Sequence, residues 1–183
     1  PYARNLYRIL SKKTFLFSEM IATKTLIHSK NTQTIIANTL QNPIALQVGG
    51  SEYEDLKISS KLAYELNYDE INLNVGCPSK AVQKGSFGAC LMKDKTLVKN
   101  CLDSMQINRD IDVSIKCRIG LGKDVNYEFF EEVIDEMLKS VITSLLYTDV
   151  STKKKFIIVC NKWFDESLLK EKTIQPIYYP SIN

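Results

Sequence analysis

Residues 68–79 read YDEINLNVGCPS, and this stretch decides how the rest of the chain is interpreted. Its first half predicts a buried strand over residues 70–73, and its second half predicts a tight turn after that strand. The turn places Cys77 between Gly76 and Pro78, with Asn74 three residues before the cysteine. A turn that leaves a strand end in this way suits a reactive side chain at the mouth of a sheet or barrel.

Strands and helices alternate on both sides of this stretch. Further strands are predicted at residues 14–17, 44–48, 112–117 and 156–159. Helices are predicted at residues 4–10, 21–30, 94–107 and 127–138, and after a capping box formed by Ser51 and Glu54. Residues 139–155 change from apolar to polar, and we interpret them as an insertion.

Alternation at this spacing implies parallel strands joined by right-handed crossovers. An open doubly wound sheet and a part of a (β/α)8 barrel both fit. The lack of a GxGxxG or Walker pattern weakens the nucleotide-binding alternatives. Polar residues at the strand ends (Glu19, Gln47, Asn74, Lys116 and Arg118) favour a site at the rim of a barrel. Five strands are fewer than the eight of a closed barrel, so we predict a partial barrel of the α/β class.

Length and composition limit the alternatives. A chain of 183 residues is long enough for one sizeable core, and its net charge of +3 permits a nucleic-acid partner without requiring one. No apolar run could span a bilayer, so no membrane role is expected. The five cysteines form no C-x-x-C pair, which argues against a metal site and favours reduced thiols. We expect a cytoplasmic location, with an organelle as the alternative.

Cys77 is the leading candidate for chemistry, because a thiol can act as a nucleophile or as a general acid. The alternative is a small buried hydrophobic residue, which is the default for the other four cysteines. Lys116 lies among apolar residues, so it either points inward to meet an anion or an electron-rich ligand, or lies at the surface. Gln47 and Asn74 could bind a heterocycle edge or cap the following loops. Arg118 and Lys80 could meet phosphates or be solvated charges.

These segments, taken in order, closely resemble the signature of the tRNA-dihydrouridine synthases, and most of all their A-type branch. The resemblance rests on YDEINLNVGCPS at 68–79, VQ at 82–83, GSFGACLM at 85–92, FSEM at 17–20, PIALQVGG at 43–50 and IKCRIG at 115–120. It is strong over residues 4–130 and patchy over residues 156–179.

The resemblance implies an FMN-dependent (β/α)8 barrel that reduces a uridine of tRNA to 5,6-dihydrouridine, with NADPH reducing the flavin. Cys77 matches the general acid that protonates C5 of the uracil after hydride has reached C6. Gln47 and Lys116 match flavin contacts, and Asn74 matches a residue at the flavin and the uracil. Arg118, at the site mouth, and Lys80 are the residues expected to meet tRNA.

The sequence also departs from the family. The family's His-Ala-Arg-Lys segment is replaced by VCNK at residues 159–162, so the histidine that contacts the flavin is a valine here. The first barrel strand, the glycine-rich phosphate loops and the C-terminal helical tRNA-binding domain have no counterpart. Residues 1–183 are therefore expected to form a single incomplete catalytic domain with about strands 2–6 of the barrel.

Three functions follow from these observations. The first is an active tRNA-dihydrouridine synthase, and the second is a truncated or degenerate relative that is inactive, with or without RNA binding. The third is a flavin barrel that acts on a free pyrimidine, and the length of the match over residues 72–92 argues against it.

Overall fold

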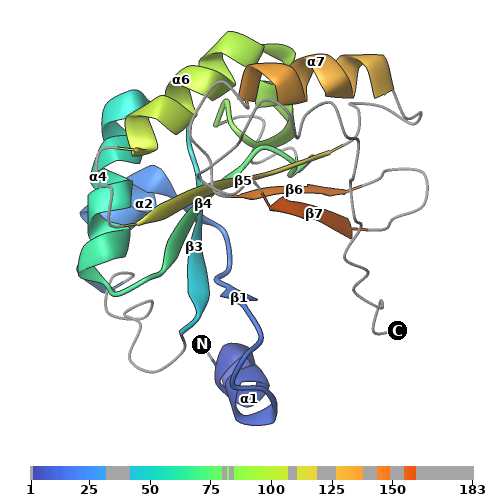
Figure 1. Cartoon of the computed structure of the whole chain (residues 1–183). Helices are drawn as coiled ribbons and strands as arrows, with labels where there is room; N and C mark the ends of the chain where they lie inside the picture. The colour runs from blue at the N-terminus through green and yellow to red at the C-terminus, as the bar shows by residue number, and fades with distance from the viewer. Residues whose placement is uncertain are drawn as a thin grey trace.

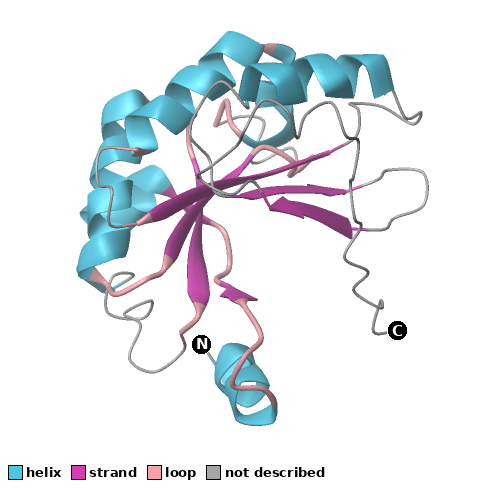
Figure 2. Ribbon diagram, viewed as in Figure 1, coloured by secondary structure: helices cyan, strands magenta, loops and turns pink. Residues whose placement is uncertain are grey.

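The strands form one curled sheet in a computed structural model that describes residues 2–31, 42–79, 82, 85–106, 111–118, 127–137, 144–148 and 155–159. The seven strands are β1 (Leu16–Phe17), β2 (Ile21–Ala22), β3 (Ile44–Gly49), β4 (Glu70–Asn74), β5 (Asp112–Arg118), β6 (Ser144–Thr148) and β7 (Lys155–Val159). Their order across the sheet is β1-β3-β4-β5-β6-β7, and β2 also pairs with β3. Figure 2 shows the sheet curling like part of a barrel wall.

The helices are α1 (Tyr2–Leu10), α2 (Thr23–His28), α4 (Tyr53–Glu65), α6 (Lys95–Met105) and α7 (Tyr127–Met137), with a short 3-10 helix, η1 (Gly88–Lys93). In Figure 1, α2, α4, α6 and α7 follow one another in an arc along one face of the sheet, whereas α1 lies apart from this layer beside β1. Parallel strands with helices on the outer face are the arrangement of a partial (β/α)8 barrel, as predicted.

Three parts of the sheet differ from the sequence prediction. Residues 21–22, predicted as the start of a helix, form β2 and pair in parallel with β3. Residues 144–148, within the stretch interpreted as an insertion, form β6 and pair in parallel with β5. The strand at 155–159 is present as β7, but it runs antiparallel to β6, so the prediction of a parallel strand there is wrong. The connection between β6 and β7 is too short for a helical crossover, and a short connection returns a chain antiparallel.

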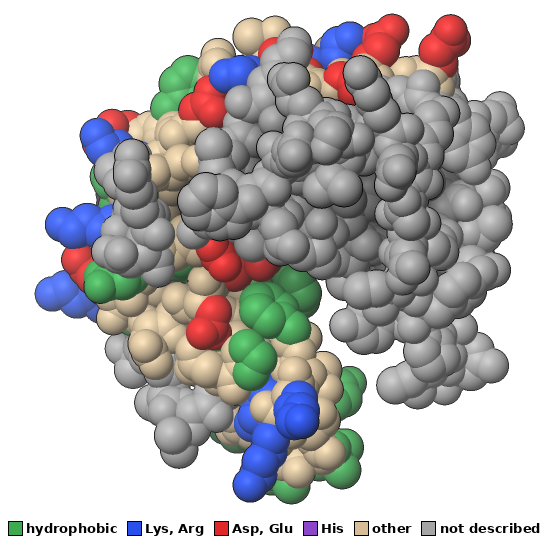
Figure 3. Space-filling model, viewed as in Figure 1, with side chains coloured by type: hydrophobic (Ala, Val, Ile, Leu, Met, Phe, Trp, Pro, Cys, Tyr) green, Lys and Arg blue, Asp and Glu red, His purple; other side chains and the backbone are tan. Residues whose placement is uncertain are grey.

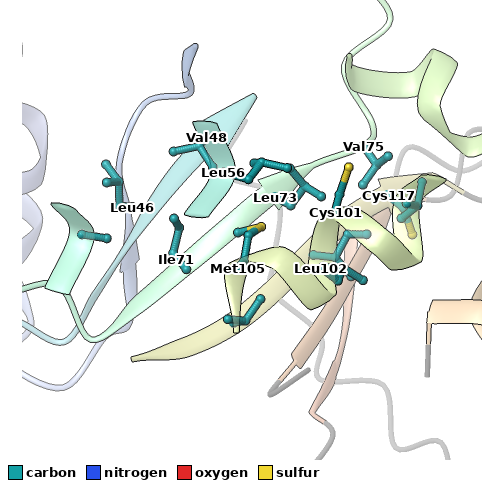
Figure 4. Close-up of a cluster of buried hydrophobic side chains, with 14 of the residues drawn as sticks. Leu46, Val48, Leu56, Ile71, Leu73, Val75, Cys101, Leu102, Met105 and Cys117 are labelled. Atoms are coloured by element: carbon teal, nitrogen blue, oxygen red, sulfur yellow. The ribbon is translucent and has the colours of Figure 1, made fainter. Parts of the chain in front are cut away.

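Each central strand has one apolar face and one polar face, because successive side chains of a strand point to opposite sides. The apolar face packs under the helices, where a single core cluster includes Leu46, Val48, Ile71, Leu73, Ile115 and Cys117 from the strands, and Val75 directly after β4. Among the side chains labelled in Figure 4, Leu56 of α4 and Cys101, Leu102 and Met105 of α6 belong to the same cluster. Burial of the apolar face fixes the register of the strands, and with it the polar face.

The N-termini of α4 and α6 differ. Asp94 precedes α6, and its side chain accepts a hydrogen bond of 2.9 Å from the backbone N–H of Leu97. The capping box predicted at Ser51 and Glu54 is wrong, because α4 begins at Tyr53 and its N-cap residue is Glu52, whose side chain makes no capping bond.

We expect Asp94→Ala to lower the free energy of unfolding by about 1 kcal/mol, because it leaves an N–H at the start of α6 without its partner. Glu52→Ala, the matched change at the N-cap of α4, should alter it by less than about 0.5 kcal/mol. Urea unfolding of both variants measures the difference. Equal losses would show that the Asp94 side chain does not act as a cap.

Helix α1 exposes a large apolar surface. Its exposed large apolar side chains are Tyr2, Leu6, Tyr7, Ile9 and Leu10. Figure 3 shows hydrophobic side chains over α1 at the bottom of the view, next to lysine and arginine side chains. The helix is tied to the sheet by polar contacts, since buried Arg4 forms an ion pair with Glu19, and Arg8 Nη2 donates to the carbonyl of Pro43 at 2.9 Å. An apolar surface is what an open barrel is expected to expose.

Candidate active site

The polar face of the sheet points away from the helices, and it carries the candidate site. It presents Gln47 from β3, Glu70, Asn72 and Asn74 from β4, and Ser114 and Lys116 from β5. Glu70, Asn72, Asn74 and Ser114 are buried, although all four are polar. Buried polar groups are costly unless they are hydrogen-bonded, so their bonding partners decide how this face is built.

Five of these side chains form one continuous set of hydrogen bonds, which we call the amide network: Asn74, Gln47, Asn72, Ser114 and Glu70. Asn74 Nδ2 donates to Gln47 Oε1 at 3.0 Å, and Gln47 Nε2 donates to Asn72 Oδ1 at 2.8 Å. Asn72 Nδ2 donates to Ser114 Oγ at 2.7 Å, and the Ser114 hydroxyl donates to Glu70 Oε1. The network therefore crosses β3, β4 and β5 and satisfies the buried groups within the sheet.

The turn that holds Cys77 is attached directly to this network. Asn74 Oδ1 accepts hydrogen bonds from the backbone N–H groups of Gly76, at 3.2 Å, and of Cys77, at 2.9 Å. On the other side, the carbonyl of Cys77 accepts a bond of 3.0 Å from the backbone N–H of Ala89. The Cys77 side chain is itself partly exposed. The backbone of the turn is thus held on both sides while the thiol reaches the surface.

Gly88 allows the bond between Ala89 and Cys77 to form, because a side chain does not fit at position 88. Its φ is +74°, in the left-handed region that favours glycine. A Cβ at this position would lie 2.4 Å from Cγ1 of Val82 and 2.7 Å from the carbonyl oxygen of Cys77. The start of η1 therefore packs directly against the cysteine turn.

A second close approach occurs at Gly49, at the carboxyl end of β3. A Cβ there would lie 2.6 Å from Cε2 of Phe87 and 3.2 Å from Sδ of Met20. Phe87 and Met20 come from segments on opposite sides of β3 in the sequence. The absence of a side chain at Gly49 therefore lets an aromatic ring and a thioether each approach this end of β3 closely.

Two basic residues of β5 lie beside the turn. Lys116 pairs with Asn74 in the register of β4 and β5, and its backbone carbonyl accepts a bond of 2.8 Å from the N–H of Val75. It shares the face of Ser114, so the structure places it inward and half-buried rather than at the surface. Arg118 Nη1 is 3.5 Å from the carbonyl of Gly76. Lys80 lies outside the described residues.

Burial separates the described cysteines into two pairs. Cys101 and Cys117 are buried, and this burial raises the pKa of each thiol from 9.0 to about 12. Cys77 and Cys90 are partly exposed. The interpretation of Cys101 and Cys117 as core residues is therefore confirmed, while Cys160 lies outside the described residues.

These burial differences predict which cysteines react. At pH 8, iodoacetamide should modify Cys77 and Cys90 at least about 100-fold faster than Cys101 and Cys117, because the attacking species is an accessible thiolate. Peptide mapping by mass spectrometry measures the four rates, and urea should abolish the difference. Equal rates in the native chain would contradict the buried positions.

The raised pKa values of Cys101 and Cys117 also predict how the stability of the fold depends on pH. An unfolded chain loses these protons near pH 9, whereas the folded chain keeps them until about pH 12. Between these two pH values the folded state binds more protons than the unfolded state, so the free energy of unfolding should fall as the pH rises. Below about pH 9 these two thiols should have no effect on stability.

Glu70, Asn72 and Ser114 also belong to this face, although we did not predict them from the sequence as members of the site. The signal was present in the alternation of polar and apolar residues along EINLN (70–74) and DVSIKCR (112–118). That alternation indicates strands with one polar face, and a polar face turned away from covering helices must be satisfied by its own side chains.

No cation site or membrane helix is found in the parts of the chain that the structure describes. Within them, no three His, Cys, Asp or Glu side chains converge so as to hold a metal ion. None of the helices in these segments is long and apolar enough to cross a membrane.

Comparison with known proteins gives consistent matches. The family model for dihydrouridine synthase (Dus) matches residues 1–144. A tRNA-dihydrouridine(20/20a) synthase of Vibrio parahaemolyticus is 39% identical over 98% of this chain and 52% of its own length, and that of Escherichia coli K12 is 38% identical over 99% and 50%. The Vibrio cholerae enzyme is 46% identical over 73% of this chain and 40% of its own length. The chain thus spans about half the length of the curated relatives it matches.

Proposed function

The chain belongs to the dihydrouridine synthase family, and from this premise we propose that the protein reduces a uridine of tRNA to 5,6-dihydrouridine, with FMN as cofactor and NADPH as reductant. One observation carries the proposal. The backbone of the Cys77 turn is held by Asn74, and the Asn74 amide is bonded to Gln47, beside inward-facing Lys116. The backbone of a partly exposed cysteine is therefore held by an amide at the end of β4, in a sheet whose polar face also carries Gln47 and Lys116 and is turned away from the helices.

The residues of this face fit a flavin. We propose that Gln47, Asn74 and Lys116 hold the FMN ring, because amide N–H groups and an ammonium group suit its carbonyl oxygens and ring nitrogens. A lysine near the ring also favours the negative charge that reduction places on it. Reduced FMN would supply the hydride for the pyrimidine ring.

Cys77 is the proposed proton donor. Saturation of the C5–C6 double bond needs one hydride and one proton, so a group with an acidic hydrogen must face C5 when hydride reaches C6. The Cys77 thiol carries such a hydrogen, and its turn is fixed by the bonds of its own N–H and C=O groups. The uridine must leave its stack to reach the site, and Arg118 and Lys80 are the proposed contacts to the RNA phosphates.

A visible spectrum tests the cofactor. The purified 183-residue chain, mixed with FMN and separated from the excess, should retain a flavin absorbance. With NADPH and unmodified tRNA it should then form dihydrouridine. The relatives are named tRNA-dihydrouridine(20/20a) synthases, so the experiment also determines which positions of the tRNA carry the reduced uridines. A chain that retains no flavin would overturn the proposal that this polypeptide is itself the enzyme.

Lys116→Met should weaken FMN binding about 10- to 100-fold, because the substitution keeps the length of the side chain and removes a charged hydrogen-bond donor. Fluorescence titration with FMN measures the dissociation constant. Lys61→Met, which removes an exposed lysine of α4, is the control and should leave binding unchanged. Equal binding by the two variants would remove Lys116 from the cofactor site.

A second candidate is a relative that no longer catalyses the reaction. It is favoured by β7, which turns back antiparallel to β6 and ends at Val159, where the family carries a histidine. Such a protein would retain no flavin in the experiment above. Binding of tRNA by that flavin-free chain, measured by filter retention, would separate an RNA-binding relative from one without this function.

A further inference from the structure

The amide network can have only one direction. Backbone N–H groups can only donate, so the oxygen of the Asn74 side chain must face those of Gly76 and Cys77. The Asn74 nitrogen must then face Gln47 Oε1, which turns the Gln47 nitrogen toward Asn72 Oδ1. The amide orientations therefore follow from the backbone at one end of the network and do not depend on assigning oxygen and nitrogen from their positions.

The far end of the network must accept a hydrogen bond. Asn72 Nδ2 donates to Ser114 Oγ, so the hydroxyl hydrogen of Ser114 is left to donate to Glu70 Oε1. A carboxyl oxygen is suited to end such a series, because it can accept without donating in return. Each member must therefore present a donor or an acceptor at a particular place in the network.

We propose that Glu70, Ser114 and Asn72 are positioning residues, which fix the orientation of the Gln47 and Asn74 amides and thereby hold the backbone of the Cys77 turn. This inference rests on the proposed function only for its consequence in catalysis. Glu70 and Ser114 are buried and act through the amides between them and the turn.

The direction of the network also determines which ligand chemistry the site accepts. Gln47 Oε1 and Asn74 Oδ1 are both used within the protein, and each NH2 group uses one of its two hydrogens there. Each amide therefore keeps a second N–H that the network does not use, and neither can turn its oxygen outward without breaking the network. The site should accordingly prefer a ring edge with hydrogen-bond acceptors, such as carbonyl oxygens or unprotonated ring nitrogens.

Ser114→Ala tests the positioning role, and Ser60→Ala is its matched control. Both serines are fully buried, but the Ser60 hydroxyl donates to the carbonyl of Met105, outside the network. Hydrogen exchange of backbone N–H groups is measured in the 183-residue chain. Ser114→Ala should speed exchange at Gly76 and Cys77 about tenfold relative to Leu73 in the neighbouring strand, whereas Ser60→Ala should not change this ratio.

A second pair of variants distinguishes the positioning role from a general loss of folding. Glu70→Gln keeps an oxygen that can accept from Ser114, whereas Glu70→Met does not. Exchange at Gly76 and Cys77 should therefore be slower in Glu70→Gln than in Glu70→Met. Equal exchange in the two variants, or no difference between Ser114→Ala and Ser60→Ala, would overturn the positioning role.

Addition of FMN separates this inference from the proposed function. In the unsubstituted chain, FMN should shift the side-chain NH2 resonances of Gln47 and Asn74, and in Ser114→Ala it should bind about tenfold more weakly. If the unsubstituted chain binds no FMN but Ser114→Ala still speeds exchange at the turn, the network stands and the flavin proposal fails. If FMN binds and the two serine variants behave alike, the flavin proposal stands and the network inference fails.

Discussion

Cys77→Ala should reduce dihydrouridine formation about 100- to 10,000-fold, which is the usual contribution of a positioned general acid. Bound flavin should be unchanged, because the turn uses the backbone N–H and C=O of residue 77, and the amide network does not include the thiol. Single-turnover reduction of unmodified tRNA by the flavin-loaded chain measures the chemical step, and the absorbance of the same sample measures the flavin.

Cys90→Ala is the matched control for this experiment. Cys90, in η1, is also partly exposed, but its thiol donates a hydrogen bond of 3.0 Å to the carbonyl of Phe87 at the start of that helix. Removal of this thiol should leave the rate within about twofold of the unsubstituted chain, as expected for a change away from the reacting atoms. A Cys77→Ala variant that retains full activity would show that another group delivers the proton.

Gly88→Ala should lower the free energy of unfolding by about 3 kcal/mol or more. A left-handed backbone costs a residue with a Cβ about 1–2 kcal/mol, and forcing extra atoms into a packed site costs about 1–3 kcal/mol. The added Cβ would lie 2.7 Å from the carbonyl of Cys77, and a backbone atom cannot move aside as the end of a flexible side chain can. Urea unfolding measures the loss, and faster alkylation of Cys77 would report that its turn has moved.

Ser86→Gly is the opposite change in the same loop. Ser86 has a φ of +57°, so glycine would relieve strain there while adding disorder to the unfolded chain. The two effects nearly cancel, and the variant should unfold within about 1 kcal/mol of the original chain. Equal behaviour of the two variants would mean that Gly88 is not held against the cysteine turn.

The strands that build the site could be predicted from the sequence because their signals are local. In β3 the apolar run is bounded by Pro43 and by Gly49 and Gly50, and in β4 the strand ends at the turn that carries Cys77. Such breaks fix where a strand starts and stops without knowledge of the fold. The inward side of Lys116 needed the register of β4 with β5, which the sequence alone left open.

The parts that were missed depend on distant contacts. β6 was interpreted as an insertion, and it becomes a strand by pairing with β5. The direction of β7 follows from the partner that it returns to, which its own residues do not specify. The predicted capping box failed because Glu52 is the extended residue before α4, so Ser51 lies one position too early to cap it. The amide network joins residues 25 to 44 positions apart, beyond the range of any local pattern.

The single direction of the amide network has a consequence for how its sequence can evolve. Aspartate matches asparagine in size, but at position 72 it would place an oxygen where a donor to Ser114 is required. Drift at one position would therefore be harmful unless a second position changed in step, because the members act as a unit and their effects are not additive. Among related sequences, substitutions at these five positions should therefore be correlated with one another.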